Sequence, residues 1–257
     1  MKKVLSVIAA AAMLLSLTAC KGKDTSSGAA DLKTLRVGAD VVYPPFEYFD
    51  TDGTTPIGID VELSKALGEK LGCEVEIVNT AWDGIFAGLS KGDYDVVISA
   101  VTITPDRLLE FDFSDPYIEN WQSIVTLSGA DVKPADPSEL AGLKVGYLEE
   151  STSDVYLTNY IAENGIQVET FEYATMMNAY DDLAAGRLDA VISDSTVATK
   201  YIADERFTQT WLQTDGEPEQ FAVCMPKGSD DLKAKINTAL AELKADGTLD
   251  SIFNTYF

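Results

Sequence analysis

The sequence has 257 residues, and its composition and charge exclude several classes of protein. A hydrophobic content of 46% is enough to fill the cores of compact lobes. The 42 acidic and 19 basic residues give a net charge of −23, which excludes nucleic acid as a partner because phosphates need a basic surface.

Histidine is absent, which excludes Ser-His-Asp and Cys-His catalysis and HExxH zinc sites. No carboxylates follow the spacing of a calcium loop. We therefore expect neither a metal nor a cofactor.

The N-terminus carries the pattern of a signal peptide. Two lysines precede an apolar run from Val4 to Leu17, and small residues follow. The run is shorter than the ~20 residues that a membrane-spanning helix needs. Residues 1–19 are therefore predicted to direct export and to be removed.

The sequence Leu17-Thr18-Ala19-Cys20 resembles the lipobox of bacterial lipoproteins. The resemblance implies that Cys20 becomes the first mature residue and carries acyl chains. Residues 20–31 then form a flexible tether rich in Gly, Ser, Lys and Asp. The predicted location is outside the cytoplasm, lipid-anchored on the outer face of the cytoplasmic membrane or, in a two-membrane host, in the periplasm. The alternative is a soluble secreted protein with an incidental cysteine.

The other two cysteines, Cys73 and Cys224, both lie in strand-like apolar runs. A disulfide would be compatible with an exported protein. Because the sequence does not show that the two strands are neighbours, we expect two buried free thiols instead.

The chain repeats two short patterns. Leu35-Arg36-Val37-Gly38 resembles Leu143-Lys144-Val145-Gly146, and the segment from Gly92 to Ser99 resembles that from Gly186 to Ser193. Each half thus runs from a strand beginning Leu-basic-Val-Gly to a strand ending Val-Ile-Ser. This indicates two lobes built to the same plan.

Helical patterns alternate with these strands. Apolar residues at helical spacing from Leu63 end before Gly72, and further helices are predicted over about 153–163 and 175–185. Because the strands are continuous apolar runs, the fold class is α/β with mostly parallel, buried sheets. Asp52-Gly53 is predicted to form a turn between Phe49 and Ile57.

The C-terminal segment has no lobe of its own. It contains a predicted strand over Phe221–Met225, a helix from Asp230 and a short last helix. We expect these elements to return to the first lobe. The predicted division is residues 32–120 with 221–257 in the first lobe and 121–220 in the second. Crossovers near Asn120–Gln122 and Glu219–Phe221 would form a hinge.

Candidate binding residues follow the two matching strands. Ligands of parallel α/β sheets bind beyond the carboxyl ends of the strands. Arg107 follows the first strand and Asp194 the second. An arginine grips a carboxylate with two bonds, and an aspartate binds an ammonium group, so the pair suits a zwitterionic amino acid. Taken singly, Arg107 could be a surface arginine and Asp194 a helix N-cap.

With these motifs together, the chain resembles the extracellular solute-binding proteins that supply polar amino acids to ABC importers. The resemblance covers the predicted mature chain. It implies a two-lobed periplasmic-binding-protein-like fold of type II, with two crossovers forming a hinge and the ligand cleft between the lobes. The matching segments are Gly38-Ala39-Asp40, Tyr43-Pro44-Pro45-Phe46-Glu47-Tyr48, Gly58-Ile59-Asp60-Val61-Glu62-Leu63, Trp82-Asp83-Gly84-Ile85-Phe86-Ala87-Gly88-Leu89, Ile103-Thr104-Pro105-Asp106-Arg107, Phe111-Asp112-Phe113-Ser114-Asp115-Pro116-Tyr117 and Asp189-Ala190-Val191-Ile192-Ser193-Asp194.

The resemblance also implies a role for each site residue. Arg107, helped by Thr102, would bind the α-carboxylate, and Asp194 the α-ammonium. Tyr43 and Trp82 would sandwich the ligand's side chain, where aromatic faces also favour a cation. The alternative for these two rings is an ordinary place in the core.

Asp40 matches a position that contacts the polar end of the ligand's side chain, and Ser99 and Ala100 would line the pocket. The alternative for Asp40 is to cap the Tyr43-Pro44-Pro45 turn.

One segment departs from the family pattern. Relatives usually carry Gly-Thr-Thr or a similar cluster after the strand that opens the second lobe, whereas this chain has Glu150-Ser151-Thr152. Ser151 and Thr152 can still contact the ligand, with Thr152 capping the next helix. Glu150 either turns outward or meets a cationic ligand. With Asp40, it favours a basic amino acid.

The predicted function is therefore capture of a polar, basic L-amino acid by a monomeric binding protein that serves a membrane permease and ATPase. It is not expected to be an enzyme. One alternative is a ligand-sensing receptor module. Another is a cyclohexadienyl dehydratase-like enzyme, for which Glu150 is the one candidate acid and has no evident base partner.

Overall fold

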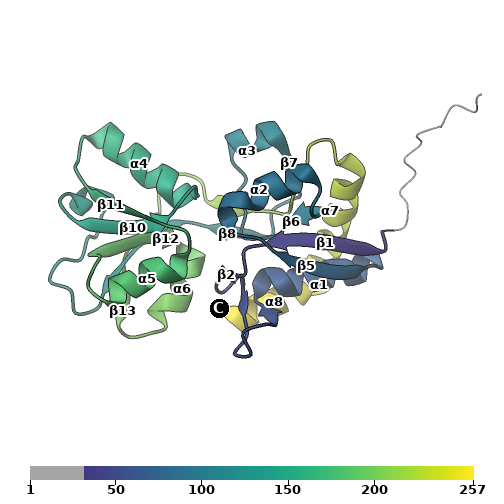
Figure 1. The fold of residues 1–257 in the computed structure, drawn as a ribbon, viewed down its shortest axis with the longest axis horizontal. Coiled ribbons are helices and arrows are strands. Elements are labelled where there is room, and N and C mark those ends of the chain that lie inside the picture. Colours follow the sequence, from purple (N-terminus) through teal and green to yellow (C-terminus); the bar gives the residue numbers. More distant parts are fainter. Residues whose placement is uncertain (1–31) are drawn as a thin grey trace, which may run out of the picture. The chain divides into compact units, whose positions relative to one another are not determined.

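The computed structural model describes residues 32–257, and these contain two five-stranded sheets (Figure 1). The strand orders are β5-β1-β6-β15-β7 and β11-β10-β12-β9-β13. The predicted signal peptide, the predicted lipidation site Cys20 and the whole predicted tether lie outside the described residues. Within residues 32–257, no helix combines the length and apolar character that crossing a membrane requires.

The first sheet and its helices form what we call the first lobe. Parallel pairing joins β1 to β5 and β6, while β15 runs antiparallel to β6 and β7. Its elements are β1 (Thr34–Ala39), β2 (Val42–Tyr43), β3 (Glu47–Phe49), β4 (Pro56–Ile57), α1 (Ile59–Leu71), β5 (Glu74–Asn79), α2 (Trp82–Lys91), β6 (Val96–Val97), α3 (Pro105–Glu110), β7 (Phe111–Phe113), β15 (Cys224–Pro226), α7 (Asp230–Ala245) and α8 (Thr248–Tyr256).

The second lobe surrounds the other sheet, in which β10 pairs in parallel with β11 and β12, and β9 lies antiparallel between β12 and β13. Its elements are β9 (Gln122–Leu127), the 3-10 helix η1 (Pro137–Leu140), β10 (Lys144–Leu148), α4 (Thr152–Asn164), β11 (Glu169–Tyr173), α5 (Met176–Ala184), β12 (Ala190–Asp194), α6 (Ser195–Ile202) and β13 (Phe207–Leu212). The fold class and the two lobes are as predicted, and the boundaries between the lobes stay a prediction.

Two short antiparallel strands connect the lobes. They are β8 (Ile118–Asn120) and β14 (Glu219–Phe221), and they coincide with the two expected crossovers. The prediction of one strand over Phe221–Met225 was wrong, because the chain there changes sheets. Phe221 ends β14, and the main-chain N–H of Val223 donates to Ser114 Oγ at 3.0 Å before β15 begins at Cys224.

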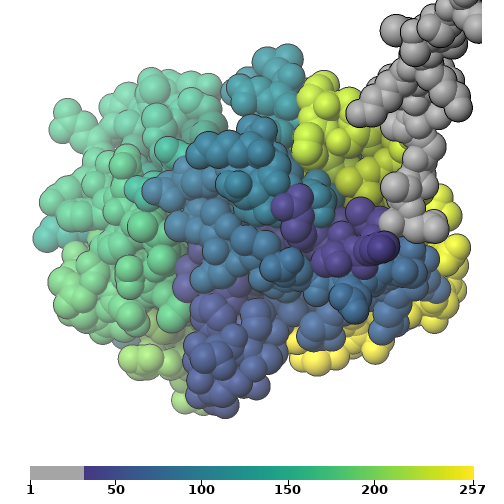
Figure 2. Space-filling model, turned by 45° about the vertical axis from the view of Figure 1, so that its right-hand side comes forward, coloured from purple at the N-terminus to yellow at the C-terminus, as the bar shows by residue number. Residues whose placement is uncertain are grey.

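The C-terminal helices return to the first lobe, as expected. Both α7 and α8 pack against α1, and Figure 2 shows this yellow segment beside the blue and purple N-terminal segments. The apolar positions of α7 explain the contact, because Ile236, Leu240 and Leu243 share one face of the helix and are buried.

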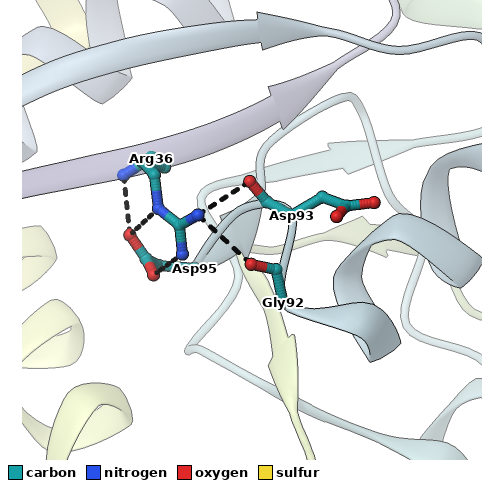
Figure 3. Close-up of polar contacts among 4 residues, drawn as sticks. All are labelled: Arg36, Gly92, Asp93 and Asp95. Carbon is teal, nitrogen blue, oxygen red and sulfur yellow. Dashed lines mark hydrogen bonds and ion pairs between the residues drawn. The ribbon is translucent and has the colours of Figure 1, made fainter.

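The internal repeat appears in the structure as one recurring contact. In the first lobe, the main-chain N–H of Arg36 donates to Asp95 Oδ2 at 2.9 Å, and the guanidinium grips the same carboxylate (Figure 3). In the second lobe, the N–H of Lys144 donates to Asp189 Oδ2 at 2.8 Å. The two strands that matter for the site are therefore aligned in the same way in both lobes.

The glycine that ends each Leu-basic-Val-Gly motif is explained by close packing. A Cβ atom built on Gly38 would lie 2.5 Å from the ring of Tyr94, and one on Gly146 would lie 2.5 Å from Leu188 Cδ1. Tyr94 and Leu188 occupy equivalent places in the two repeats, and both are buried. A larger residue at either glycine would displace a side chain that packs against the strand.

The two remaining cysteines are free thiols. Cys224 on β15 is buried, but Cys73 is only half-buried, which corrects the prediction of two buried thiols. Cys73 follows the αL residue Gly72 at the start of an edge strand, where one side faces solvent. Strands β1 and β6 lie between the two cysteines, so they are not neighbours.

We predict that Gly38→Ala destabilises the protein by about 1–3 kcal/mol, since the ring of Tyr94 is too confined to move away. Urea denaturation followed by tryptophan fluorescence measures the change. Gly129→Ala is the matched control, because its Cβ would meet no atom within 4 Å. Equal stability of the two variants would contradict this account of the repeated glycine.

Candidate functional site

A cavity of about 350 Å³ lies at the carboxyl ends of the strands, with walls from both lobes. The structure brings together all ten residues that the sequence singled out, and it adds Leu148 at the end of β10. The lining residues are Asp40, Tyr43, Trp82, Ser99, Ala100, Thr102, Arg107, Leu148, Ser151, Thr152 and Asp194.

The ends of strands β1 and β6 supply the floor of the cavity. Asp40 follows β1 directly, and Ser99 and Ala100 follow β6. The main-chain N–H of Asp40 donates to Ser99 Oγ at 3.1 Å, which ties the two strand ends together. Ala100 has a φ of 47°, in the left-handed region that alanine rarely adopts.

Arg107 stands at the start of α3, where the local sequence fixes its position. Pro105 begins this helix, and Thr104 caps it by accepting the main-chain N–H of Arg107 at 3.2 Å. The guanidinium lies over the rings of Trp82 and Phe86, 5.3 and 5.0 Å from their centroids. Burial lowers the pKa of Arg107 from its ordinary value.

The guanidinium keeps donors for a ligand. Its Nη1 donates to the main-chain carbonyl of Thr102 at 3.0 Å, its one side-chain hydrogen bond within the described part of the chain. Arginine has five N–H donors in a planar fork. The remaining donors can grip a carboxylate placed in the cavity, and the aromatic faces hold the fork in plane.

Asp194 faces the cavity from the end of β12. It occupies the N-cap position of α6, but its side chain accepts no hydrogen bond from that helix. Its carboxylate instead accepts the phenolic O–H of Tyr43 at 2.5 Å and Asn120 Nδ2 at 2.7 Å. The simple N-cap interpretation of Asp194 therefore does not apply.

The environment of Asp194 disfavours its charge. Burial, reinforced by the nearby negative charge of Glu219, raises the pKa of Asp194 to about 7. Arg107 and the two hydrogen-bond donors oppose this rise only in part. A positively charged group in the cavity would therefore be attracted strongly by this carboxylate.

The bond between Tyr43 and Asp194 also crosses between lobes, because β2 belongs to the first lobe and β12 to the second. Burial, together with the charge of Asp194, raises the pKa of Tyr43 well above its ordinary value, so the phenol remains a donor.

The loop after β10 differs in one respect from the prediction. Ser151, rather than Thr152, caps α4, and its Oγ accepts the N–H of Asp154 at 3.2 Å. Thr152 is the first residue of the helix, so its hydroxyl is free to donate to Glu219 Oε2 at 2.9 Å. Glu150 is exposed and lies outside the cavity lining, so of the two alternatives it turns outward.

Asp40 is buried, and burial raises its pKa to about 6, with the main-chain N–H of Trp82 opposing the rise. The Tyr43-Pro44-Pro45 turn is closed by the main chain, since the N–H of Phe46 donates to the carbonyl oxygen of Tyr43 at 3.0 Å. The side chain of Asp40 is therefore not needed as a cap, and it lines the cavity.

Sequence reasoning missed Glu219, which lies on β14 behind the cavity. Its Oε2 accepts the hydroxyls of Thr102 and Thr152, at 3.2 and 2.9 Å, from opposite lobes. Asn120 Nδ2 and Gln122 Nε2 also donate to this carboxylate. The sequence placed Glu219 in a crossover, but nothing in the local pattern distinguished it from a surface glutamate.

The cavity wall therefore carries more acidic than basic groups. Asp40 and Asp194 line the cavity with one guanidinium, that of Arg107, and the carboxylate of Glu219 lies behind the wall, near Asp194. Within residues 32–257, no three Cys, Asp or Glu side chains are grouped so that they could hold a metal ion.

Comparison with known proteins identifies relatives along the whole described chain. The family model described as "Bacterial extracellular solute-binding proteins, family 3" matches residues 35–257. A probable histidine-binding protein of Neisseria gonorrhoeae is 31% identical, over 100% of this chain and 96% of the relative. The L-cystine-binding protein of Escherichia coli strain K12 is 34% identical, over 87% of this chain and 82% of the relative.

A solved structure agrees with the fold. An ancestral arginine-binding protein bound to arginine is 37% identical and has a TM-score of 0.81, covering 89% of this chain and 100% of the solved one.

We predict that Asp194→Asn stabilises the ligand-free protein at pH 8 by on the order of 2 kcal/mol and has little effect near pH 4. Because the pKa of Asp194 is raised, the native state holds its proton more tightly than the unfolded chain does, and stability falls as pH rises from about 4 through about 7.

Denaturation at a series of pH values gives the difference between variant and wild type. Exposed Asp215, changed to Asn, serves as the control. A difference for Asp194→Asn that does not vary with pH would contradict the burial argument.

Proposed function

The chain belongs to family 3 of the bacterial extracellular solute-binding proteins, and we propose that it captures a cationic L-amino acid between its lobes. It then delivers this ligand to the permease and ATPase of an ABC importer.

The observation that carries the proposal is the placement of Arg107 and Asp194 in one cavity, on different lobes. The guanidinium would bind the α-carboxylate with two parallel bonds, and Asp194 would bind the α-ammonium. An α-amino acid presents these two charges on neighbouring atoms, so one ligand can satisfy both groups. Holding both requires the lobes to be together, which links binding to closure.

A cationic side chain fits the remaining charges. Asp40 and Glu219 stay without a basic partner once Arg107 and Asp194 have bound the two α-groups. The rings of Tyr43 and Trp82 flank the same cavity, and aromatic faces attract cations. The relatives point the same way, since several bind arginine or histidine.

Membrane attachment completes the proposal. An acylated Cys20 with more than one chain would hold the protein durably at the outer surface of the membrane, whereas one chain gives only marginal binding. A tether over residues 20–31 would then keep a monomeric binder close to its permease and raise its effective concentration there.

Enzymatic activity is not part of the proposal. The curated relatives are binding proteins of transporters. Glu150, the acid that a dehydratase-like mechanism would need, is exposed and outside the cavity.

We predict that Arg107→Ala abolishes the binding of every amino acid, because the carboxylate clamp is common to all of them. Two charge-assisted bonds of about 1.5–3 kcal/mol each correspond to a loss of roughly 10²–10⁴-fold in affinity. Isothermal titration calorimetry measures the loss.

Arg187→Ala is the matched control, since this arginine is exposed and pairs only with Asp182 on the surface of the second lobe. Retained affinity in Arg107→Ala would exclude this site.

We predict that Asp40→Asn changes which ligand is preferred more than whether a ligand binds. Loss of this carboxylate should reduce the preference for L-arginine over L-glutamine by about tenfold. The pKa of about 6 means that Asp40 becomes charged as pH rises through 6, so the wild-type preference should grow over the same interval.

A thermal-shift panel of arginine, lysine, ornithine, histidine, glutamine and cystine measures this preference, because a ligand stabilises the state it binds. Exposed Asp106, changed to Asn, is the control. A uniform loss across the panel would contradict the role given to Asp40.

A further inference from the structure

Two carboxyl groups lie directly behind the cavity floor without lining the cavity. Glu47 belongs to β3 and Asp60 to the first turn of α1, and both are buried, with exposures of 0% and 1%. Both lie in segments that match the family, and no role was predicted for either of them from the sequence. Buried acids of this kind are rare unless they are paired.

Each carboxyl holds one residue of the floor. Ser99 Oγ donates to Glu47 Oε1 at 2.6 Å and accepts the main-chain N–H of Asp40 at 3.1 Å. The main-chain N–H of Ala100 donates to Asp60 Oδ2 at 2.7 Å. Hydrogen bonds to these two acids therefore hold the floor of the cavity in place.

The bond from Ala100 compensates for an unfavourable backbone. A left-handed conformation is unfavourable for a residue such as alanine, so it persists only where its surroundings fix it. The bond to the buried Asp60 is such a contact, and Tyr117 strengthens the arrangement by donating its O–H to the same Oδ2 at 3.0 Å.

The second oxygen of each acid has no other donor. Glu47 Oε2 and Asp60 Oδ1 are buried and meet no hydrogen-bond donor of the described residues. The charge of Asp60 disfavours a second buried charge on Glu47, so one of the two acids is expected to hold a proton.

The surroundings place the proton on Glu47. Asp60 accepts two hydrogen bonds and sits near the N-terminus of α1, which favours its anion. Burial raises the pKa of Asp60 to about 6, whereas burial and the charge of Asp60 raise the pKa of Glu47 well above its ordinary value.

We propose that Glu47 and Asp60 share one proton and act as positioning residues that hold Ser99 and Ala100, the floor of the cavity, in the conformation that takes the ligand. The ligand-binding part of this inference rests on the proposed function. The support given to the floor depends only on the contacts described above.

The other charged and titratable groups near the pair do not neutralise a second negative charge. Asp40 after β1 adds repulsion, and Tyr43 on β2 and Tyr117 before β8 remain neutral phenols. Among the described residues, no lysine or arginine acts on either acid. Loss of the shared proton at alkaline pH would leave two adjacent buried anions, and the floor should loosen.

The sign of the pH effect follows from the raised pKa of Glu47. The native state binds this proton more tightly than the unfolded chain does, so stability falls as pH rises above about 4.5 toward the raised value. Glutamine cannot titrate but can still accept from Ser99 and donate to Asp60. Glu47→Gln should therefore keep the floor in place over the whole range.

The experiment compares Glu47→Ala, Glu47→Gln and the control Glu69→Gln, an exposed glutamate on α1. Hydrogen–deuterium exchange of the peptide containing Ser99 and Ala100 reports on the floor without ligand. Titration with L-arginine from pH 6 to 9 reports on binding. Expected results are faster exchange and about tenfold weaker binding for Glu47→Ala, with rescue by Glu47→Gln.

Between pH 6 and 9, the wild-type affinity should also fall more steeply with rising pH than that of Glu47→Gln. Unchanged exchange in Glu47→Ala, or identical pH profiles for wild type and Glu47→Gln, would overturn the inference. If Glu47→Ala does not fold, the comparison of wild type with Glu47→Gln is sufficient to test the inference. If the wild type does not bind arginine, the proposed ligand is wrong, and the exchange measurement still tests the floor.

Discussion

The burial of Asp194 between the two lobes is the constraint on which the rest of the site depends. A carboxylate removed from water needs compensating donors or a cation. Tyr43 and Asn120 supply donors, yet Glu219 adds a second negative charge nearby, and the pKa of Asp194 rises to about 7. A ligand ammonium would supply the missing charge. The closed arrangement of the lobes is thus most favourable when such a ligand is present, which is the thermodynamic requirement for a protein that closes on its solute.

The repeated architecture explains why Asp194 and Arg107 line one cavity from different lobes. In both lobes a Leu-basic-Val-Gly strand pairs in parallel with the strand that leads to the site, and the register is the same, with Val37 opposite Val96 and Val145 opposite Ala190. Close packing against the glycine fixes each pair of strands. Parallel strands present their carboxyl ends at one edge of a sheet. Two copies of this unit that face each other therefore form one cavity, and the side chains on its two walls can differ in charge. One copy supplies the cation and the other the anion.

Local rules were enough to predict the repeated strands, several helix ends and the two charged residues Arg107 and Asp194, because periodicity, glycine stops and strand ends depend on short segments. The other eight predicted residues of the eleven that line the cavity came from the resemblance to the family. Local rules failed where a contact between residues far apart in the sequence determines the local structure. The run from Phe221 to Met225 has the composition of one strand, but pairing with β8 and then β6 divides it. Ser151 and Thr152 are both good caps, and the contact of Thr152 with Glu219 accompanies the choice of Ser151. The role of Glu219 could not be predicted from its neighbours, because the residues that donate hydrogen bonds to it lie far away in the sequence.

The acids behind the cavity are stabilised by uncharged hydrogen-bond donors, as Asp194 is. Glu47, Asp60 and Glu219 are held by hydroxyl, amide and main-chain donors rather than by lysine or arginine. Arg107 is consequently the one guanidinium beside several carboxyl groups in the described site. A neutral or acidic ligand would leave that imbalance in place or increase it, whereas a cationic amino acid reduces it. The proposed preference for a basic ligand therefore rests on the charge of the whole site rather than on any single contact.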